Sequence, residues 1–562
     1  MDAIVFGASG FIGRHLVAEL LARGQRVAAA VREDTLSAWL DAHGVETGGL
    51  SVVTADITRP LAGLPAARDV YNTAGRYAFG LTRQAARAVN VSGALNVLEW
   101  AATLPGLRRL VHVSGYRVSA ASGQPDYAAL GAYEASKIEG DLAVRARAAE
   151  LGVALTIANP SAVIGPGQYI GPATLVRDLW NGRLPALPGG PATFVPVVEA
   201  GYFARFLAEV PAGPAGEHYW VLDDATPPLP ELIGLIAAHL GVRAPRRSIP
   251  AGLLRRLPRA LTGADPETLS FLSAERYPTA SARAFAARAG LETPPVEGVV
   301  RAWADGLVGT RFGAAPPALS PHGFHDVAGG RTWIAGERHR PAYVLLHGLP
   351  MNADLWAPPA AYLDGPILAP DLPGLGRSAP AASTDAWMEG LMGPVRTRPV
   401  LVAHSLAGGP ALRFAAAHPE RVGGLVLIAP AFLQPPAARL TRSGLAPWKL
   451  RRMSAARLAG MLGVPEGPEV ASAAADLRRP GVARRVVEAL RTAFAEREHS
   501  RALLERAGVP VQIVAGSADP LTLAAGHPVT EIAGAGHYPQ LTHPIEVSQI
   551  AVMGLRSRQQ RF

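Results

Sequence analysis

Tyr133 and Lys137 stand four positions apart in the sequence Tyr-Glu-Ala-Ser-Lys. On a helix, this spacing projects both side chains from one face. The Lys137 ammonium would then lower the pKa of the Tyr133 phenol, which could exchange a proton with a substrate carbonyl or alcohol. Among the 54 basic residues only Lys137 and Lys449 are lysines, so chance explains the pair poorly.

A second set of reactive residues occurs in the order serine, aspartate, histidine. Its members are Ser405, Asp519 and His537. Ala403 and Ala407 flank the serine at two residues' distance, as a tight strand-to-helix turn requires. In such a triad the histidine takes the serine proton, and the aspartate orients the imidazole and stabilises its cation. The pattern predicts a serine nucleophile that attacks an acyl carbon.

Attack on an acyl carbon produces an oxyanion, which needs two backbone N–H donors. Leu406, directly after the serine, is predicted to supply one donor. Leu349, in the sequence His347-Gly-Leu-Pro, is predicted to supply the other. His347 itself is interpreted as a structural residue of this loop.

A glycine-rich turn near the N-terminus predicts a dinucleotide site. It follows the apolar stretch 3–6 and precedes an amphipathic stretch. Glycines permit a tight turn and close approach of a pyrophosphate, whose negative charge the N-terminus of the following helix favours. The predicted cofactor-binding residues of this turn are Gly7, Ser9, Gly10, Phe11, Ile12 and Gly13.

The elements that position these motifs are short apolar runs alternating with amphipathic stretches, which predicts an α/β fold in both halves. Residues 1–312 are expected to form a doubly wound parallel sheet, and residues 323–562 a second α/β domain. The breaker-rich segment 313–322 is interpreted as the linker. Between about 432 and 504 amphipathic helices replace the strands, which predicts a helical lid.

Residues 1–312 resemble the extended short-chain dehydrogenase/reductases, with NAD-dependent epimerase/dehydratase-like and dihydroflavonol-reductase-like features. The resemblance rests on the GxxGxxG spacing, the Tyr133 and Lys137 pair, and landmarks in the expected order. These are Asp56 in Thr-Ala-Asp-Ile, Asn72-Thr-Ala-Gly75, Asn90-Val-Ser-Gly93 and Asn159-Pro160. It implies a Rossmann fold that binds NAD(P) and a substrate lobe mainly in residues 159–312.

The same resemblance implies that Tyr133 and Lys137 also bind the cofactor, with Lys137 at the nicotinamide ribose. It further implies that Asp56 lies near the adenine and that Ala74 and Gly75 line the cofactor. The second predicted strand ends at Arg32, where an arginine accommodates the 2′-phosphate of NADP and an acidic residue would bind the 2′-hydroxyl of NAD. Arg32 therefore favours NADP, with NAD as the alternative.

One position departs from the family pattern. The customary serine or threonine of the reductase site aligns with Gly115. Ser114, one residue earlier, is the candidate for this role through a shifted turn. The alternatives are Tyr116 and a hydroxyl of the substrate.

Residues 323–562 resemble the α/β-hydrolases. The resemblance rests on the ordered triad and on Asp371-Leu-Pro-Gly-Leu-Gly-Arg-Ser378, a loop signature that is not catalytic in that family. Epoxide hydrolases and haloalkane dehalogenases carry aspartate at the position of Ser405. The resemblance therefore implies esterase, lipase, thioesterase, C–C hydrolase or perhydrolase chemistry.

Composition limits the remaining possibilities. The net charge of +9 comes from arginines spread along the chain, so a nucleic-acid partner is not expected. The absence of cysteine excludes cysteine-ligated metal, and no metal site is predicted. No apolar run reaches about 18 residues, and a cytoplasmic location is expected.

The sequence thus predicts a bifunctional enzyme, an NAD(P)-dependent oxidoreductase fused to a serine hydrolase. Its expected partners are small apolar carbonyl and ester compounds, and a homodimer could form through the N-terminal domain. The alternative is an NADP-binding sensor or scaffold that regulates the hydrolase. The identity of both substrates stays open.

Overall fold

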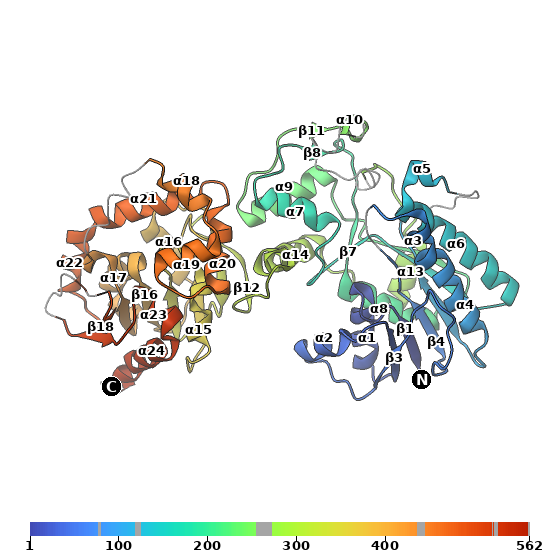
Figure 1. Ribbon diagram of the computed structural model, residues 1–562, viewed down its shortest axis with the longest axis horizontal. Coiled ribbons are helices and arrows are strands. Elements are labelled where there is room, and N and C mark those ends of the chain that lie inside the picture. Colours follow the sequence, from blue (N-terminus) through green and yellow to red (C-terminus); the bar gives the residue numbers. More distant parts are fainter. Residues whose placement is uncertain are drawn as a thin grey trace. The chain divides into compact units, whose positions relative to one another are not determined.

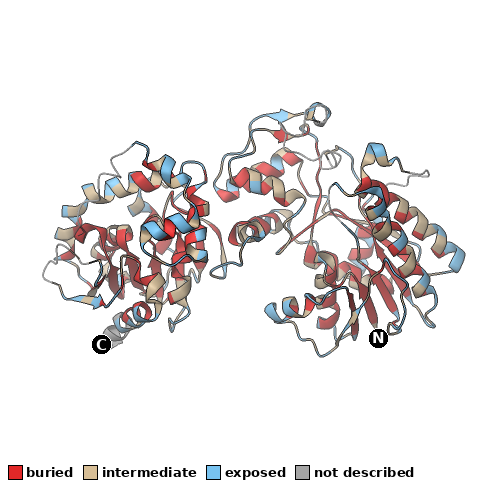
Figure 2. Ribbon diagram, viewed as in Figure 1, coloured by how far each residue is buried: buried red, intermediate tan, exposed pale blue. Residues whose placement is uncertain are grey.

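The computed structural model describes residues 1–76, 80–118, 125–254, 272–434, 444–519, 521 and 527–559. The chain divides into two compact units, and each contains a central sheet flanked by helices (Figure 1). Unit 1 comprises residues 1–175, 185–236 and 245–303, and unit 2 comprises residues 176–184, 237–244 and 304–562. Figure 2 shows that the strands of both sheets are largely buried.

The sheet of unit 1 has seven parallel strands in the order β10-β6-β5-β4-β1-β2-β3. Its strands are β1 (Ala3–Phe6), β2 (Val27–Val31), β3 (Leu50–Thr54), β4 (Asp69–Asn72), β5 (Arg109–Val113), β6 (Leu155–Pro160) and β10 (His218–Val221). Alternate residues of β1 enter two different cores, because helices cover both faces of the sheet. The predicted doubly wound Rossmann sheet is confirmed.

Helices α1, α2, α8 and α13 pack in one of these cores, and α4 and α6 pack in the other. Their bounds are α1 (Phe11–Ala22), α2 (Leu36–Ala42), α4 (Ala94–Ala102), α6 (Ala132–Leu151), α8 (Ala200–Glu209) and α13 (Ala280–Arg288). The other described helices of the first 310 residues are α3 (Arg83–Arg87), α5 (Tyr127–Leu130), α7 (Pro172–Trp180), α9 (Leu229–Leu240), α10 (Ala251–Leu254) and α14 (Val296–Gly309). Two further sheets have two parallel strands each. One pairs β7 (Ala162–Ile164) with β9 (Val197–Glu199), and the other pairs β8 (Leu187–Pro188) with β11 (Ser248–Ile249).

The sheet of unit 2 has eight strands in the order β12-β13-β15-β14-β16-β17-β18-β19. They are β12 (His322–Val327), β13 (Gly330–Gly336), β14 (Tyr343–Leu346), β15 (Ile367–Pro370), β16 (Val400–His404), β17 (Gly424–Ile428), β18 (Val511–Gly516) and β19 (Val529–Ile532). Strand β13 is antiparallel to both of its neighbours, and the strands from β15 to β19 are parallel. This is the predicted α/β-hydrolase sheet.

Helices of unit 2 flank the sheet and form the lid. Those outside the lid are α15 (Ala357–Ala360), α16 (Thr384–Met392), α17 (Gly408–Ala417), α23 (Pro539–Thr542) and α24 (Pro544–Gln559). Between β17 and β18 lie α18 (Ala446–Arg451), α19 (Ala455–Leu462), α20 (Pro468–Leu477), α21 (Val482–Ala495) and α22 (Arg497–Leu504). The described residues of the predicted lid 432–504 thus contain helices and no strand; residues 435–443 lie outside the described residues.

The unit boundary differs from the predicted division at residues 312 and 323. The change of unit falls inside α14, between Trp303 and Ala304, and unit 2 also includes 176–184 and 237–244. Within unit 2, His239 Nε2 lies 2.7 Å from Asp305 Oδ1. The linker was predicted from local composition. Local composition does not reveal contacts between residues that are so far apart in the chain.

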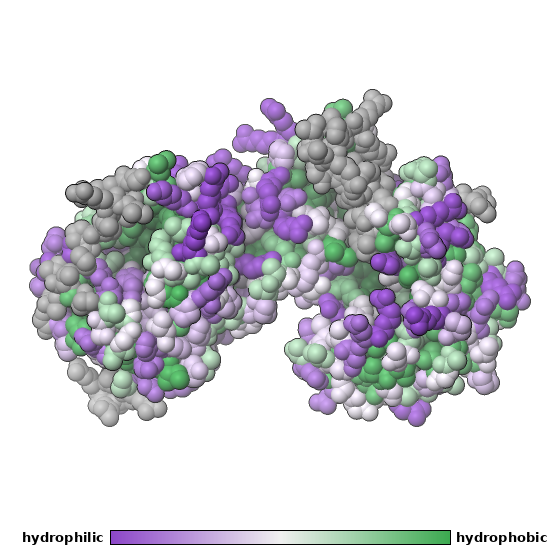
Figure 3. All heavy atoms as spheres, in the orientation of Figure 1, coloured by the Kyte–Doolittle hydropathy of each residue, from purple (hydrophilic) through white to green (hydrophobic). Residues whose placement is uncertain are grey.

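The surfaces of both units mix residue types. On the face shown in Figure 3, hydrophilic and apolar side chains are interspersed over each unit. Among the residues that the structure describes, no helix has both the length and the apolar character of a membrane span.

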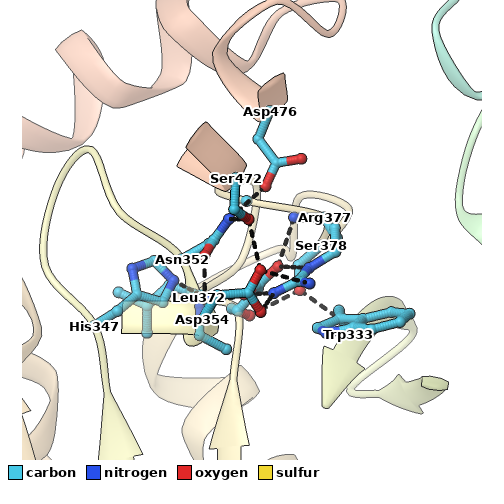
Figure 4. Close-up of polar contacts among 12 residues, drawn as sticks. Trp333, His347, Asn352, Asp354, Leu372, Arg377, Ser378, Ser472 and Asp476 are labelled. Atoms are coloured by element: carbon cyan, nitrogen blue, oxygen red, sulfur yellow. Dashed lines mark hydrogen bonds and ion pairs between the residues drawn. The ribbon is translucent and has the colours of Figure 1, made fainter. Parts of the chain in front are cut away.

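A buried ionic cluster lies at the loops that follow β14 and β15 (Figure 4). The Arg377 side chain is only 2% exposed, and its guanidinium lies 2.8 Å from Asp371 Oδ2 and 2.8 Å from Asp354 Oδ1. Burial alone would raise the pKa of Asp354, but the charges of Arg377 and Arg311 outweigh burial and lower that pKa below its ordinary value. The carboxylate therefore stays ionised inside the protein.

Lid helix α20 joins this cluster through two side chains. Ser472 donates to Asp354 Oδ2 at 2.5 Å, and Asn352 Nδ2 donates to Asp476 Oδ2 at 2.7 Å. Arg311 lies 2.6 Å from the other oxygen of Asp476. Because every ion in the cluster has a partner, α20 is fixed to the loops of the sheet.

We predict that Arg377→Leu destabilises unit 2 by about 3–5 kcal/mol, because it leaves buried carboxylates without their cation. Urea unfolding of the full chain measures the loss. Arg484→Leu is the control, since its side chain is 71% exposed and it pairs with an exposed Glu488. Such surface pairs contribute at most about 1 kcal/mol. Equal effects of both substitutions would contradict the prediction.

Candidate active sites

Ser405 lies in the turn between β16 and α17. Its φ is 52°, a left-handed conformation that residues with a side chain rarely adopt. Ala403 and Ala407 are fully buried beside it, and a Cβ on Gly348 would lie 2.9 Å from the Ser405 Cβ. This crowding explains the small residues around the serine, and the turn is typical of a nucleophile elbow.

The three residues predicted as a triad form one hydrogen-bonded chain. His537 Nε2 lies 3.0 Å from Ser405 Oγ, and His537 Nδ1 lies 2.7 Å from Asp519 Oδ2. With a neutral imidazole, Ser405 donates to Nε2 and Nδ1–H donates to the carboxylate. The side chains of His537 and Asp519 are 28% and 26% exposed, so the pair is accessible from solvent. This arrangement can deprotonate a serine and hold the proton on the imidazole.

His404 fixes the backbone of His537. Its Nε2–H donates to the His537 carbonyl oxygen at 2.8 Å. Burial lowers the pKa of His404 well below the ordinary value, so its imidazole is neutral. The residue before the nucleophile thus holds the loop that carries the histidine.

Side-chain hydrogen bonds fix the loop that contains Leu349 at two successive backbone carbonyls. His347 Nδ1–H donates to the Gly348 carbonyl at 3.0 Å, and the Tyr538 hydroxyl donates to the Leu349 carbonyl at 2.6 Å. His347 Nε2 accepts from the Leu372 N–H at 2.9 Å, which fixes its tautomer. Because the Gly348 carbonyl and the Leu349 N–H belong to one planar peptide, holding the carbonyl also sets the direction of the N–H.

A cavity of about 180 Å³ includes Ser405 in its wall. Its lining residues are Leu372, Pro373, Leu375, Thr384, Ser405, Leu406, Gly409, Pro410, Arg413, Ala431, Phe432, Ala489, Thr492, Ala493, Glu496 and Ser500. Leucine, proline, alanine and phenylalanine account for most of this wall. Arg413 bonds with Asp385 at 2.8 Å and with Glu496 at 2.9 Å, which joins α17 to the lid. The cavity suits a mainly apolar group.

Gln434 also contacts the triad, although nothing in the sequence pointed to it. Its Nε2–H donates at 2.8 Å to Asp519 Oδ2, the oxygen that also accepts from His537. Its backbone carbonyl accepts from Arg497 NH2 at 2.7 Å. A single glutamine 85 positions before its partner belongs to no motif, so only the fold could show this contact.

The glycine-rich turn of unit 1 lies between β1 and α1. Gly7 has a φ of 76°, and a Cβ there would lie 2.7 Å from the Ala74 Cα. A Cβ on Gly13 would lie 2.1 Å from the Gly7 carbonyl oxygen. The turn is therefore packed too closely for side chains, and Gly10 is the N-cap of α1. The first N–H groups of α1 can bind a diphosphate there.

The other predicted cofactor residues occupy neighbouring strand ends. Ser9, Phe11 and Ile12 are half-buried in the turn and the first turn of α1. Arg32 follows β2 and is exposed, and Asp56 follows β3. Backbone and side-chain hydrogen bonds from Thr58 lower the pKa of Asp56, and the nearby charge of Arg32 contributes to the shift.

Tyr133 and Lys137 lie one turn apart on α6. Lys137 Nζ donates to the Val113 carbonyl at 3.1 Å, and a Cβ on Gly75 would lie 3.7 Å from the same nitrogen. Burial lowers the pKa of Lys137 to about 8, while the charge of Asp141 acts in the opposite direction. The structure thus brings Lys137 to the ends of β4 and β5.

A π-helical turn, η1 (Ala88–Gly93), packs against α6. Asn90 Nδ2 donates to Ser136 Oγ at 2.9 Å, and its Oδ1 accepts from the Arg76 N–H at 3.1 Å. A Cβ on Gly140 would lie 2.1 Å from the Asn90 carbonyl oxygen. This close contact sets the position of α6 beside the sheet.

The two protein residues that are candidates for the missing hydroxyl, Ser114 and Tyr116, are both buried. Ser114 follows β5, and its Oγ is buried. Tyr116 is only 7% exposed. Gly115 lies between them, and a Cβ built on it meets no heavy atom of the described residues within 4 Å, apart from its chain neighbours. Direct contact between the Ser114 hydroxyl and a substrate is therefore not favoured, and position 115 has room for a side chain.

Comparison with known protein families assigns the two halves separately. Residues 3–180 match the model of the NAD dependent epimerase/dehydratase family. Residues 343–550 match the model of the alpha/beta hydrolase family.

Individual relatives also match one half each. Sterol demethylase protein B of Methylococcus capsulatus is 30% identical over 272 residues, which cover 45% of this chain and 79% of that protein. The pimeloyl-[acyl-carrier protein] methyl ester esterase of Aromatoleum aromaticum is 30% identical over 246 residues, which cover 37% of this chain and 94% of that protein. A 3beta-hydroxysteroid-dehydrogenase/decarboxylase of Arabidopsis thaliana is 27% identical over 282 residues, which cover 45% of this chain and 64% of that protein.

We predict that Gly13→Ala weakens binding of NADPH and NADH at least tenfold, about 1.4 kcal/mol, because the added methyl group forces the turn open. Fluorescence titration of the reduced nucleotide measures the affinity. Gly48→Ala is the matched control, since a Cβ there meets no atom of the part of the chain that the structure describes within 4 Å. Unchanged affinity in Gly13→Ala would contradict the assignment of this turn to the cofactor.

Proposed function

Because its N-terminal part belongs to the NAD-dependent epimerase/dehydratase family and its C-terminal part to the α/β-hydrolase family, we propose that this chain is a bifunctional enzyme. In this proposal, unit 1 is an NAD(P)-dependent oxidoreductase for a carbonyl or alcohol substrate. Unit 2 is a serine hydrolase for a small, mainly apolar ester. The hydrogen-bonded chain from Ser405 through His537 to Asp519 carries the proposal.

The hydrolase mechanism follows from this geometry. Ser405 Oγ attacks the ester carbonyl and passes its proton to His537 Nε2, while Asp519 stabilises the imidazolium. The N–H groups of Leu406 and Leu349 stabilise the oxyanion. His537 then protonates the departing alcohol, and it later activates the water that releases the acid from Ser405. The carbonyl contacts of His347 and Tyr538 support Leu349 in this role.

The cavity wall favours an apolar acyl group, because Leu372, Leu375 and Phe432 line it beside Ser405. The relative from Aromatoleum aromaticum, which is named as a methyl ester esterase, supports an ester as the substrate class.

In unit 1, Tyr133 would exchange the proton with the carbonyl or alcohol oxygen. Lys137 would hold the nicotinamide ribose and favour ionisation of the Tyr133 phenol. A bound nicotinamide cofactor supplies or accepts the hydride. Arg32 supports NADP, with NAD as the alternative. The steroid-dehydrogenase relative supports an apolar alcohol or ketone as the substrate class.

A second candidate function for unit 1 is an NADP-binding sensor or scaffold that regulates the hydrolase. Glycine at position 115 and the buried Ser114 hydroxyl favour it, because the substrate carbonyl would lack its usual hydrogen-bond donor. Tight NADPH binding without NADPH consumption across a broad panel of ketones and aldehydes would select this function.

We predict that Ser405→Ala lowers hydrolysis of p-nitrophenyl butyrate at least a thousandfold and abolishes labelling by a fluorophosphonate. The loss follows because alanine has no nucleophilic oxygen with which to form the acyl-enzyme. Tyr133→Phe serves as the control and should retain full ester hydrolysis. Wild-type rates in Ser405→Ala would exclude the serine mechanism.

For unit 1 we predict that Tyr133→Phe lowers carbonyl-dependent NADPH oxidation at least a hundredfold, since the phenol proton is lost. NADPH affinity should remain unchanged, because the variant removes only one oxygen. Ser405→Ala is the reciprocal control and should retain oxidation. Undiminished turnover in Tyr133→Phe would remove that residue from the proposed chemistry.

A further inference from the structure

Gln434, at the beginning of the lid, contacts Asp519 through its side chain. We propose that Gln434 is a positioning residue that lowers the basicity of His537 and makes it depend on the placement of lid helix α22. The proposal rests on the proposed serine-hydrolase function of unit 2.

The geometry places two donors on one carboxylate oxygen. Gln434 Nε2 lies 2.8 Å and His537 Nδ1 lies 2.7 Å from Asp519 Oδ2. A carboxylate oxygen has two lone pairs, so both hydrogen bonds form together. Gln434 is 9% exposed, which limits competition by water for its amide. Asp519 is thus held from the lid side as well as by the histidine.

The second donor changes the electrostatics of the pair. A hydrogen bond from Gln434 offsets part of the negative charge of Asp519, so less charge remains to stabilise the His537 imidazolium. His404 and Tyr538 also face His537, with ring centroids 5.1 Å from its own. Burial keeps His404 neutral and raises the pKa of Tyr538, so neither adds charge near neutral pH. Among the described residues that bond to or stack on His537, Asp519 is therefore the charged one, and Gln434 contacts it.

Gln434 is tied to the lid through its backbone. It directly follows the short helix η7 (Ala431–Leu433), which packs against α22. Arg497, the first residue of α22, donates to the Gln434 carbonyl at 2.7 Å. Ala431, Phe432 and Ser500 on these same elements line the cavity. A displacement of α22 would therefore move the Gln434 amide relative to Asp519, and the basicity of His537 would rise.

The first test is the pH dependence of kcat/KM for p-nitrophenyl butyrate in the full chain. Its acid limb follows the pKa of His537, which must be neutral to accept the serine proton. Gln434→Leu removes the donor, and we expect the limb to move up by about half a pH unit. The isosteric Gln434→Glu adds a second carboxylate, and we expect a rise of at least about one unit.

Gln512→Leu is the matched control. Gln512 is a partly buried glutamine of β18 that bonds to Thr530, and its loss should leave the acid limb in place. A merely structural role of Gln434 would lower stability or kcat without moving the limb. An unchanged limb in both Gln434 variants overturns the proposal.

A second readout does not depend on turnover. Selective ¹³C labelling of histidine, with His537→Gln for assignment, gives the pKa of His537 directly by NMR. We expect this pKa to rise in the order wild type, Gln434→Leu, Gln434→Glu. If the wild type neither hydrolyses esters nor reacts with a fluorophosphonate, the proposed function fails, while the titration still decides the role of Gln434.

Arg497→Met tests the connection to the lid. It removes the bond to the Gln434 carbonyl and leaves the Gln434 side chain present. We expect the pKa of His537 to rise, by less than in Gln434→Leu. An unchanged pKa overturns the dependence on α22.

Discussion

Both sites depend on the edge at which the strands of a parallel sheet end. Parallel strands all finish at one edge, so the loops that follow them are brought together there even when they are distant in sequence. In unit 2, Ser405 follows β16, Asp519 follows β18 and His537 follows β19. The register of these strands therefore sets the hydrogen bonds between residues that are up to 132 positions apart.

At this edge of the sheet, the chain makes tight turns directly after the strands. Ser405 adopts a φ of 52°, and strained backbone persists only where the surroundings hold it. Here β16 is paired on both sides, with β14 and β17, and its residues are buried. In unit 1 the turn after β1 meets the equivalent demand with Gly7 and Gly13. The sheet thus sustains the strain at the serine, whereas glycine avoids it at the nucleotide turn.

Residues could be predicted from the sequence where the chemistry forms a local pattern. Ser405 directly follows a strand, and Tyr133 stands at helical spacing from Lys137. The two α/β folds follow from the alternation of apolar and amphipathic stretches. Gln434 could not be predicted, because its partner is Asp519 and nothing local to it signals the contact. Ser114 stands one residue from the customary hydroxyl position of the motif, and the burial of its hydroxyl depends on packing that the motif does not specify.

The lid is attached to the rest of unit 2 in two physically different ways. Helix α20 is bound through Ser472 and Asp476 to a buried ionic cluster, and breaking one of its pairs would leave an uncompensated charge in the interior. At the junction of α21 and α22, Glu496 pairs with Arg413 of α17, and the Glu496 side chain is 45% exposed. Exposed ion pairs exchange readily with water and are screened by salt. This charged contact therefore costs less to break than those of α20, and it lies next to Arg497, which contacts Gln434 beside Asp519.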